Sequence, residues 1–400
     1  MYTQNTPVHV KLWHKDFWLM AVANLLLTVS VYIQIPLLPV WMINNAGFSS
    51  TVVAISLGIF GLGVFSLGCF CSYLVQKYRR NLVCIRAILV LIVSFGVLYY
   101  IQRGHVFQIE GYILVPAIRF IQGAAFGLAQ MVLSSTLIID TSESFQRTEA
   151  NHSSAWFSRL ALSIGPLLFM FLSPIFNSST ITLISAILCL LSVCLILSVK
   201  FPFRAPADVI CKVSLDRFFL PQGKWLFINL TLVTIVVGLF LASEHTITFY
   251  VMLMAGFILA MLSQRFVFVN AELKSEVITG VLLMLASCLL IYTGDKNAII
   301  FISPVLFGCG IGIIGARFLL FFLKLSRHCQ RGTSQSTFFL AWEFGISLGL
   351  FLGYYFFYKD LYNIYLVAIM ILCVALLMYM TFTHKWYIRV SIRTNASFIV

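Results

Sequence analysis

The sequence predicts an all-α membrane protein with twelve transmembrane helices in two pseudo-symmetric six-helix bundles. Three observations favour this fold class. Hydrophobic residues make up 61% of the 400 residues and charged residues only 10%. Apolar runs of about 20 residues, the length that crosses a bilayer, fill nearly all of the chain. A basic segment with several prolines, near residue 210, leaves six of these runs on each side.

The twelve runs are expected to be helices, because lipid offers backbone N–H and C=O groups no hydrogen-bond partner. A transmembrane β-barrel would instead show segments of about ten residues with alternating polarity. The predicted spans are 17–41, 51–72, 82–101, 112–138, 154–175, 180–199, 225–242, 246–268, 277–293, 298–323, 337–357 and 361–382.

The spans of the first half follow one another through short loops. Lys11 and Lys15 precede span one, which is longer than the apolar core of a secretory signal and is expected to remain in the protein. Its polar residues Asn24, Tyr32 and Gln34 either face a central cavity or form hydrogen bonds between helices. Glycines in span two favour close packing of helices, and spans three to six complete a bundle over residues 1–200.

The longest polar break, residues 201–224, is predicted to be a cytoplasmic linker. It leads to a second bundle over residues 225–400, which ends in a short cytoplasmic tail. Spans seven and nine are the shortest, but both are uncharged and rich in Leu, Ile and Val. Residues 145–147 before span five resemble residues 329–331 before span eleven, which indicates an internal duplication.

The distribution of Lys and Arg predicts the orientation in the membrane. With the N-terminus inside, the basic residues of the loops lie almost entirely on the cytoplasmic side, and only Arg103, Lys296 and Lys359 lie outside. This asymmetry follows the positive-inside rule and predicts a multi-pass protein of the cytoplasmic (inner) membrane with both termini cytoplasmic. It also accounts for the net charge of +13 without a nucleic-acid partner.

The sequence contains no set of residues typical of an enzyme. There is no Ser/His/acid arrangement, no His-x-x-x-His pair and no phosphate-binding loop, and the ten cysteines lack metal-binding spacing. We therefore expect no catalytic activity, no cofactor, no metal and no ATP-driven pumping.

Three stretches are similar to motifs of the major facilitator superfamily. In span four, the segment Arg119-Phe-Ile-Gln122-Gly123-Ala-Ala-Phe-Gly127 resembles that family's Arg-x-x-Gln-Gly signature. Residues 72–80, Ser-Tyr-Leu-Val-Gln-Lys-Tyr-Arg-Arg, stand where the family has a Gly-x-x-x-Asp-(Arg/Lys)-x-Gly-Arg loop. The Gly165-Pro166 pair in span five resembles the core of a signature found in drug–proton antiporters.

The resemblance implies a secondary carrier whose two bundles rock around a central site, and the pattern is closest to bacterial sugar-efflux and multidrug carriers. It also marks candidate residues for the conformational change: Gln76, Arg79, Arg80, Gly123, Gly127, Gly165 and Pro166. Gln76 replaces the loop aspartate, which is thought to hold the two halves together in one state. A contact of that kind is therefore predicted to be uncharged and weaker here.

Charged side chains within spans are the candidates for substrate binding and coupling, because burying a charge in lipid costs about 2.5–3.5 kcal/mol. They are Arg119, Arg159, Arg317 and Glu343, the only acid deep in a predicted span, and their charges sum to +2. We therefore expect a cavity that prefers anionic or zwitterionic solutes. Gln122 lies one turn from Arg119, and the offset of the repeat makes Arg159 and Glu343 equivalent positions of the two halves.

Two interpretations of Glu343 remain open at this point. The first is an ion pair with Arg317, which lies at a similar depth in span ten. The second is a proton-carrying role, because burial favours the neutral form of a carboxyl group and brings its protonation within reach. Arg119 and Arg159 likewise either bind solute or make structural hydrogen bonds.

These expectations together predict a monomeric antiporter that exports a small solute by alternating access in exchange for protons. A lipid or lysolipid translocase on the same fold is the first alternative. An intramembrane enzyme that transfers glycan or acyl groups is the second.

Overall fold

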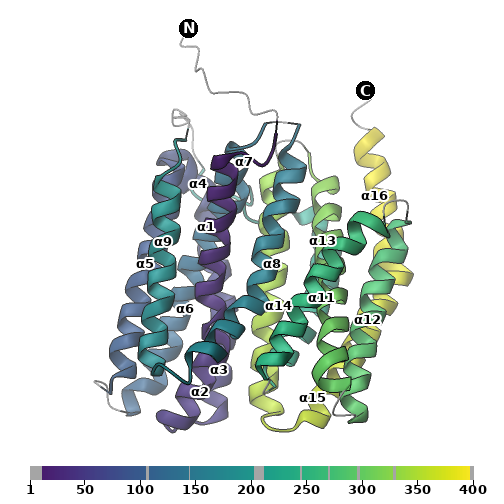
Figure 1. Ribbon diagram of the computed structural model, residues 1–400. Coiled ribbons are helices and arrows are strands. Elements are labelled where there is room, and N and C mark those ends of the chain that lie inside the picture. The colour runs from purple at the N-terminus through teal and green to yellow at the C-terminus, as the bar shows by residue number, and fades with distance from the viewer. Residues whose placement is uncertain are drawn as a thin grey trace.

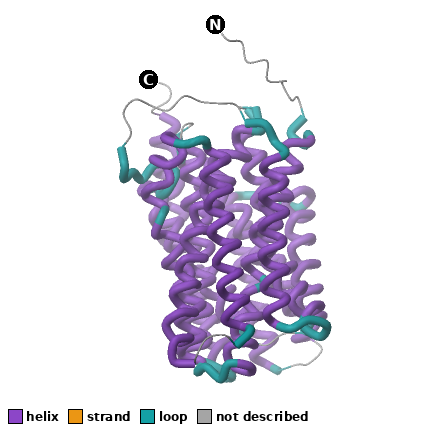
Figure 2. The backbone as a smooth tube through the Cα atoms, turned by 90° about the vertical axis from the view of Figure 1, so that its left-hand side faces the viewer, coloured by secondary structure: helices purple, strands orange, loops and turns teal. Residues whose placement is uncertain are grey.

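The structure, a computed structural model, describes residues 11–104, 108–143, 145–201, 211–243, 246–268, 271–294, 298–327 and 330–396. Within these residues the chain folds into helices and connecting loops, and twelve helical stretches are long and apolar enough to cross a membrane. Figure 2 shows that the helices run between two ends of the molecule and that the loops gather at those ends. The all-α prediction with twelve spans is confirmed.

The first half contains α1 (Lys15–Tyr32), α2 (Gln34–Val40), η1 (Trp41–Asn45), α3 (Ser50–Ser66), η2 (Gly68–Phe70), α4 (Cys71–Lys77), α5 (Arg80–Gln102), α6 (Gln108–Val132), η3 (Leu133–Leu137), α7 (Ile138–Asp140), α8 (Arg147–Leu172) and α9 (Ser178–Leu197). Several short elements continue a longer helix: α2 and η1 extend α1, and η3 and α7 extend α6.

The second half contains η4 (Pro221–Gly223), α10 (Lys224–Leu241), α11 (Ile247–Phe266), α12 (Leu273–Thr293), η5 (Ala298–Ile302), α13 (Ser303–Leu325), α14 (Arg331–Phe356), α15 (Leu361–Met378), η7 (Tyr379–Thr383) and α16 (His384–Ala396). In Figure 1 the two halves stand side by side, and α1 begins at the same end of the molecule at which α16 finishes.

The packing of the second half repeats that of the first. In the first half α1 packs on α8 and α9, α3 packs on α6, and α5 packs on α6 and α9. The corresponding helices of the second half make the same contacts: α10 packs on α14 and α15, α11 on α13, and α12 on α13 and α15. Two equivalent pairs, α3 with α14 and α11 with α8, join the halves. This correspondence is the pseudo-symmetry that the sequence repeat predicts.

Several helices extend beyond the predicted spans. Helices α8 and α14 begin at Arg147 and Arg331, whereas the spans were predicted from residues 154 and 337. The last helical stretch continues to Ser391, past the predicted end at 382. The added turns are polar, so hydropathy gave no signal for them. A helix can continue into water because each added residue completes a backbone hydrogen bond.

Candidate functional site

The candidate site lies where the two halves meet, midway along their helices. Tyr32, the last residue of α1, donates a hydrogen bond from its hydroxyl to Oε1 of Glu343 on α14 at 2.6 Å. Both side chains are buried, and Glu343 is only 3% exposed. Among the described residues no cation lies within ion-pair distance of Glu343. The buried carboxylate is therefore held by a hydroxyl donor from the opposite half.

A close approach of two helices in the first half positions Tyr32. A Cβ atom at Gly165 of α8 would lie 2.7 Å from Cβ and 2.9 Å from the carbonyl carbon of Tyr32. Only glycine fits at that distance, so Gly165 lets α8 pack directly against the turn of α1 that carries the tyrosine. Pro166 follows inside the same helix. The Gly165-Pro166 pair thus lies directly behind the side chain that contacts Glu343.

Arg159 of α8 lies near Glu343 on the line between the halves. Its Nε donates to the carbonyl of Ala155 at 3.1 Å, and its Nη1 donates to the carbonyl of Gly312 on α13 at 3.3 Å. The guanidinium carbon lies 4.1 Å from the ring centroid of Trp156, and Nη2 has no partner among the described residues. Arg159 and Glu343 line one cavity of about 30 Å³. The carbonyl contacts favour a structural role for part of the guanidinium and leave Nη2 available.

Arg119 of α6 lies on another side of Glu343. Its Nη1 donates to Oε1 of Gln122 at 2.8 Å, and its guanidinium carbon lies 4.5 Å from the ring centroid of Phe60. Its Nε has no partner among the described residues. Arg119, Tyr32 and Glu343 line a second cavity of about 10 Å³. Cavities this small hold about one water each, so the helices are packed closely around the charges.

The predicted ion pair between Arg317 and Glu343 is wrong. Arg317 of α13 instead pairs with Glu276 of α12, with its Nε donating to Oε2 at 2.7 Å and its Nη2 contacting Oε1. Glu276 is fully buried, so Glu343 is not the only acid deep among the helices. Glu276 was overlooked because it stands one residue before the predicted span 277–293, in a polar stretch. The pair neutralises the charge of Arg317 within the second half.

The polar residues of span one divide into two groups. Asn24 donates from Nδ2 to the carbonyl of Ser154 at 3.2 Å and accepts from Nε2 of Gln130 at 2.6 Å. Gln34 donates from Nε2 to the hydroxyl of Ser185 at 3.0 Å. These hydrogen bonds join helices within the first half. Tyr32 is the member of this set that reaches the interface.

The glycines of the span-four motif bring α6 onto α3. A Cβ atom at Gly123 would collide with the carbonyl oxygen of Phe60, and one at Gly127 would lie 2.5 Å from that of Val64. The close packing holds Phe60, which lies beneath Arg119, against α6. The motif therefore sets the position of the arginine through backbone contact.

Helix α4, which precedes the predicted motif loop, is held by a carboxylate from the linker. Gln76 donates to the hydroxyl of Ser72, which donates to Oδ2 of Asp216, both at 3.1 Å. Oδ1 of Asp216 accepts from Thr333 of α14 at 3.1 Å. The prediction of an uncharged contact here is wrong, because Asp216 supplies the charge that Gln76 lacks. This carboxylate joins the two halves at the end of the molecule where α1 begins.

Three arginines also lie at this end of the molecule. Arg80 pairs with Asp140 at 2.5 Å, and Arg79 occupies the N-cap position of α5. Arg217 donates from Nη1 to Thr136 of η3 at 2.8 Å and from its backbone N–H to Thr333 at 2.9 Å. Burial lowers the pKa of the Arg217 guanidinium, and repulsion from Arg80 acts in the same direction.

Lys296, which was expected on the outer side, and residues 202–210 of the predicted linker lie outside the described residues.

The comparisons agree with this architecture. The profile of the Major Facilitator Superfamily matches residues 20–350. A mutant of the nucleoside transporter NupG is similar over 92% of this chain and 99% of its own, with a TM-score of 0.67 and 15% sequence identity. The human organic anion transporter MFSD10 is similar over 90% of this chain and 98% of its own, with a TM-score of 0.66 and 12% identity. No curated protein sequence matches the chain.

Proposed function

The chain belongs to the major facilitator superfamily, and from this membership we propose that it moves a small organic anion by alternating access, with Glu343 as the proton-binding group. Residues 1–200 and 225–400 are the two bodies that rock about the central site, and residues 201–224 link them. The observation that supports this function is the placement of Glu343 on the interface of the halves, between Arg119 and Arg159.

The charges around the site favour an anionic solute. The pair of Arg317 with Glu276 is internally neutral, which leaves Arg119, Arg159 and Glu343. Each arginine keeps one guanidinium nitrogen without a partner among the described residues. Buried donors of this kind are costly unless a ligand or water accepts from them. A carboxylate or phosphate oxygen is the acceptor that arginine binds best.

Two directions of coupling follow from different observations. The resemblance at Gly165-Pro166 favours export in exchange for protons. The charge arrangement favours a second candidate, in which solute and proton move together. An anion held near Glu343 repels the ionised carboxylate and therefore favours protonation of Glu343. The solute and the proton thus strengthen the binding of each other. Competition, as an exchanger requires, would arise for a cationic solute.

Flux in proteoliposomes tests the function and its direction. Purified protein is reconstituted, and movement of labelled benzoate and labelled uridine is followed under imposed pH gradients. Benzoic acid diffuses through lipid toward the alkaline side, so flux is measured relative to protein-free liposomes. Benzoate accumulation on the alkaline side beyond that level supports co-transport, and accumulation on the acidic side supports exchange. Glu343→Gln is expected to abolish the pH-driven component. If the pH-driven flux of this variant equals that of the wild-type protein, Glu343 does not carry the proton.

The remaining proposals concern the setting of the protein. We place it in the cytoplasmic membrane as a monomer with both termini cytoplasmic. A lipid translocase on the same fold would move a fluorescent phospholipid in these proteoliposomes without moving either solute.

A further inference from the structure

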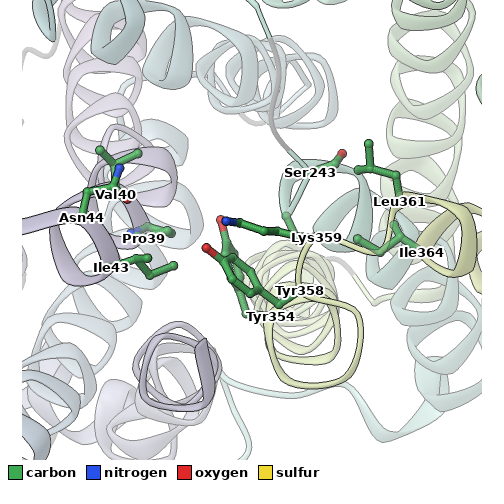
Figure 3. Close-up of a pocket in the computed structure, with 11 residues that line it drawn as sticks. Pro39, Val40, Ile43, Asn44, Ser243, Tyr354, Tyr358, Lys359, Leu361 and Ile364 are labelled. Atoms are coloured by element: carbon green, nitrogen blue, oxygen red, sulfur yellow. The ribbon is translucent and has the colours of Figure 1, made fainter. Parts of the chain in front are cut away.

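We propose that a second, outer site for organic anions lies in the cavity shown in Figure 3, with Lys359, Tyr354 and Tyr358 as its recognition groups. The inference rests on the proposed function, since it supplies the place where solute is first held before it reaches the central site. The cavity lies at the end of the molecule opposite the beginning of α1.

The cavity is large enough for a small molecule and lies between the two halves. Its volume is about 330 Å³, which falls at the lower end of the range for ligand pockets. Pro39 and Ile43 of the first half line one side, and Ser243 and Ile364 of the second half line the other. Figure 3 shows Lys359 reaching between these two sides, next to the two tyrosines.

The backbone at Lys359 is held in an unfavourable conformation. Its φ is +64°, in the left-handed region that non-glycine residues seldom adopt. Such a residue is strained and persists only where its surroundings impose the conformation. Lys359 lies in the loop between α14 and α15, where its exposed side chain lines the cavity.

The charge of Lys359 is not neutralised by a described residue. Its ammonium nitrogen lies 5.3 Å from the ring centroid of Tyr358, and no acid among the described residues pairs with it. The adjacent Asp360 instead accepts from the backbone N–H and from Nδ2 of Asn363, at 3.2 and 2.6 Å, and caps α15. Among the described residues that line the cavity, Lys359 is thus a cation without an acidic partner, and it lies beside aromatic rings.

The lining defines the class of ligand. One ammonium group binds one anionic group, and the phenol rings together with Pro39, Ile43 and Leu361 offer apolar surface. A monoanion with a flat apolar body, such as an aromatic carboxylate, satisfies both. Inorganic phosphate would leave the apolar wall in contact with water, and a neutral aromatic would leave Lys359 without a partner.

The outer cavity continues toward the central site along one face of α14. Glu343, Leu350 and Tyr354 lie at helical spacing on that face, and Leu350 lines the small cavity at Arg119. Eleven residues of helix separate Tyr354 from Glu343, or about 16 Å. Ile35 and Leu350 fill the space between the two sites. A solute in the outer cavity would therefore enter the central site once these side chains separate.

The test labels a cysteine at the mouth of the cavity. Asn44→Cys is reacted from outside, in intact cells, with an anionic or a cationic methanethiosulfonate, and modification of the peptide that contains residue 44 is measured by mass spectrometry. In water, a unit charge changes the concentration of a monovalent ion at a distance of about 6 Å by about threefold, in opposite directions for the two reagents. The ratio of the anionic to the cationic rate should therefore fall about tenfold in Lys359→Gln and be retained in Lys359→Arg.

Ligand protection is the second measurement. Benzoate should slow labelling in the Lys359 protein and not in Lys359→Gln, and the neutral isostere benzamide should not slow labelling in either. Glu244→Gln is the control for the nearest acid in the sequence, which follows Ser243. Protection by benzoate should be retained in this variant. Equal protection by benzoate and benzamide, or protection that survives Lys359→Gln, would overturn the proposal.

The same measurement separates the outer site from the central one. In a Glu343→Gln background, benzoate should still protect the cysteine although pH-driven flux is lost. If benzoate protects the cysteine in the wild-type background but no flux is measured, the outer site is supported and the transport proposal is wrong. Flux without protection would do the reverse.

Discussion

At the scale of single residues, the hydrogen bond between Tyr32 and Glu343 joins the two halves through two buried side chains. The hydroxyl is the one donor that the described residues give to this carboxylate. Any movement that separates α1 from α14 breaks this hydrogen bond. Each of the two groups must then bind another partner, which can be water, a proton or a solute. Separation of the helices and a change of ligand at Glu343 are therefore one event.

Tyr32→Phe removes this donor without changing the shape of the ring. A buried group that loses its partner costs about 1–3 kcal/mol, so the free energy of unfolding should fall by that amount. Unfolding by SDS in bicelles measures it. Tyr365→Phe, which removes the contact between Tyr365 and Ser243 within the second half, is the matched control and should leave pH-driven flux intact. An unchanged flux in Tyr32→Phe would show that the hydroxyl has no part in transport.

Arg317 and Glu276 should behave as a structural pair. Removing one partner of a buried ion pair costs about 3–5 kcal/mol, whereas replacing both by apolar residues is often neutral. We expect Arg317→Met and Glu276→Met to be strongly destabilising alone and much less so together. The double variant should also transport at a rate near that of wild type. Additive losses of stability, or loss of flux in a stable double variant, would contradict this assignment.

The residue scale is also where the sequence was least informative. Arg119, Arg159 and Glu343 could be identified because a charge in an apolar run is conspicuous. The partner of Arg317 could not, because Glu276 lies in a polar stretch of another helix, and the choice between two acids depends on how the helices pack. The αL conformation of Lys359 gave no sequence signal either, because such positions are usually occupied by glycine.

At the scale of helices, the contact of α3 with α6 depends on glycine. A methyl group at Gly123 would meet backbone atoms of Phe60, which cannot move aside as a flexible side chain can. Gly96 of α5 has open space around the corresponding position. The two sites differ in their surroundings and not in helical conformation.

Gly123→Ala should therefore destabilise the protein by about 1–3 kcal/mol, the usual cost of overpacking. Gly96→Ala should be neutral or stabilising by up to about 1 kcal/mol, because alanine favours the helix. Thermal unfolding of the two purified variants makes the comparison. Equal effects would show that α3 and α6 pack less closely than the structure has them.

Helix positions were predictable because they depend on local hydropathy, and the repeat added a long-range relation. Arg147 and Arg331 begin α8 and α14, and both helices contain 26 residues. The equivalent positions Arg159 and Glu343 therefore lie at the same depth and line one cavity. The sequence aligned these residues, but their meeting depends on the orientation of the two bundles.

At the scale of the whole molecule, the two ends of the interface differ. At the end where α1 begins, Asp216, Arg217 and Thr333 connect the halves. At the other end a cavity of about 330 Å³ separates them. The interface is thus closed at the end where α1 begins and open at the opposite end. This is the arrangement of a carrier whose central site faces the opposite end. The repeat predicts two similar bodies but not which end is closed, because both states use the same helices.

Alternating access requires the closed end to open, and a disulfide across it should stop transport. A Cβ atom at Gly332 of α14 would lie 3.1 Å from Cβ of Ser135 in η3, slightly below the usual 3.5–4.5 Å for a disulfide, and 2.7 Å from the Ser135 carbonyl oxygen. A small shift of α14 from η3 therefore accompanies the cross-link. We expect Ser135→Cys combined with Gly332→Cys to cross-link under mild oxidant and to lose most of its flux. Reduction should restore it, and neither single variant should respond. Because labelling of Asn44→Cys occurs at the open end, it should continue in the cross-linked protein. Full flux with the cross-link formed would mean that this end never separates, and the rocking mechanism would not hold for this chain.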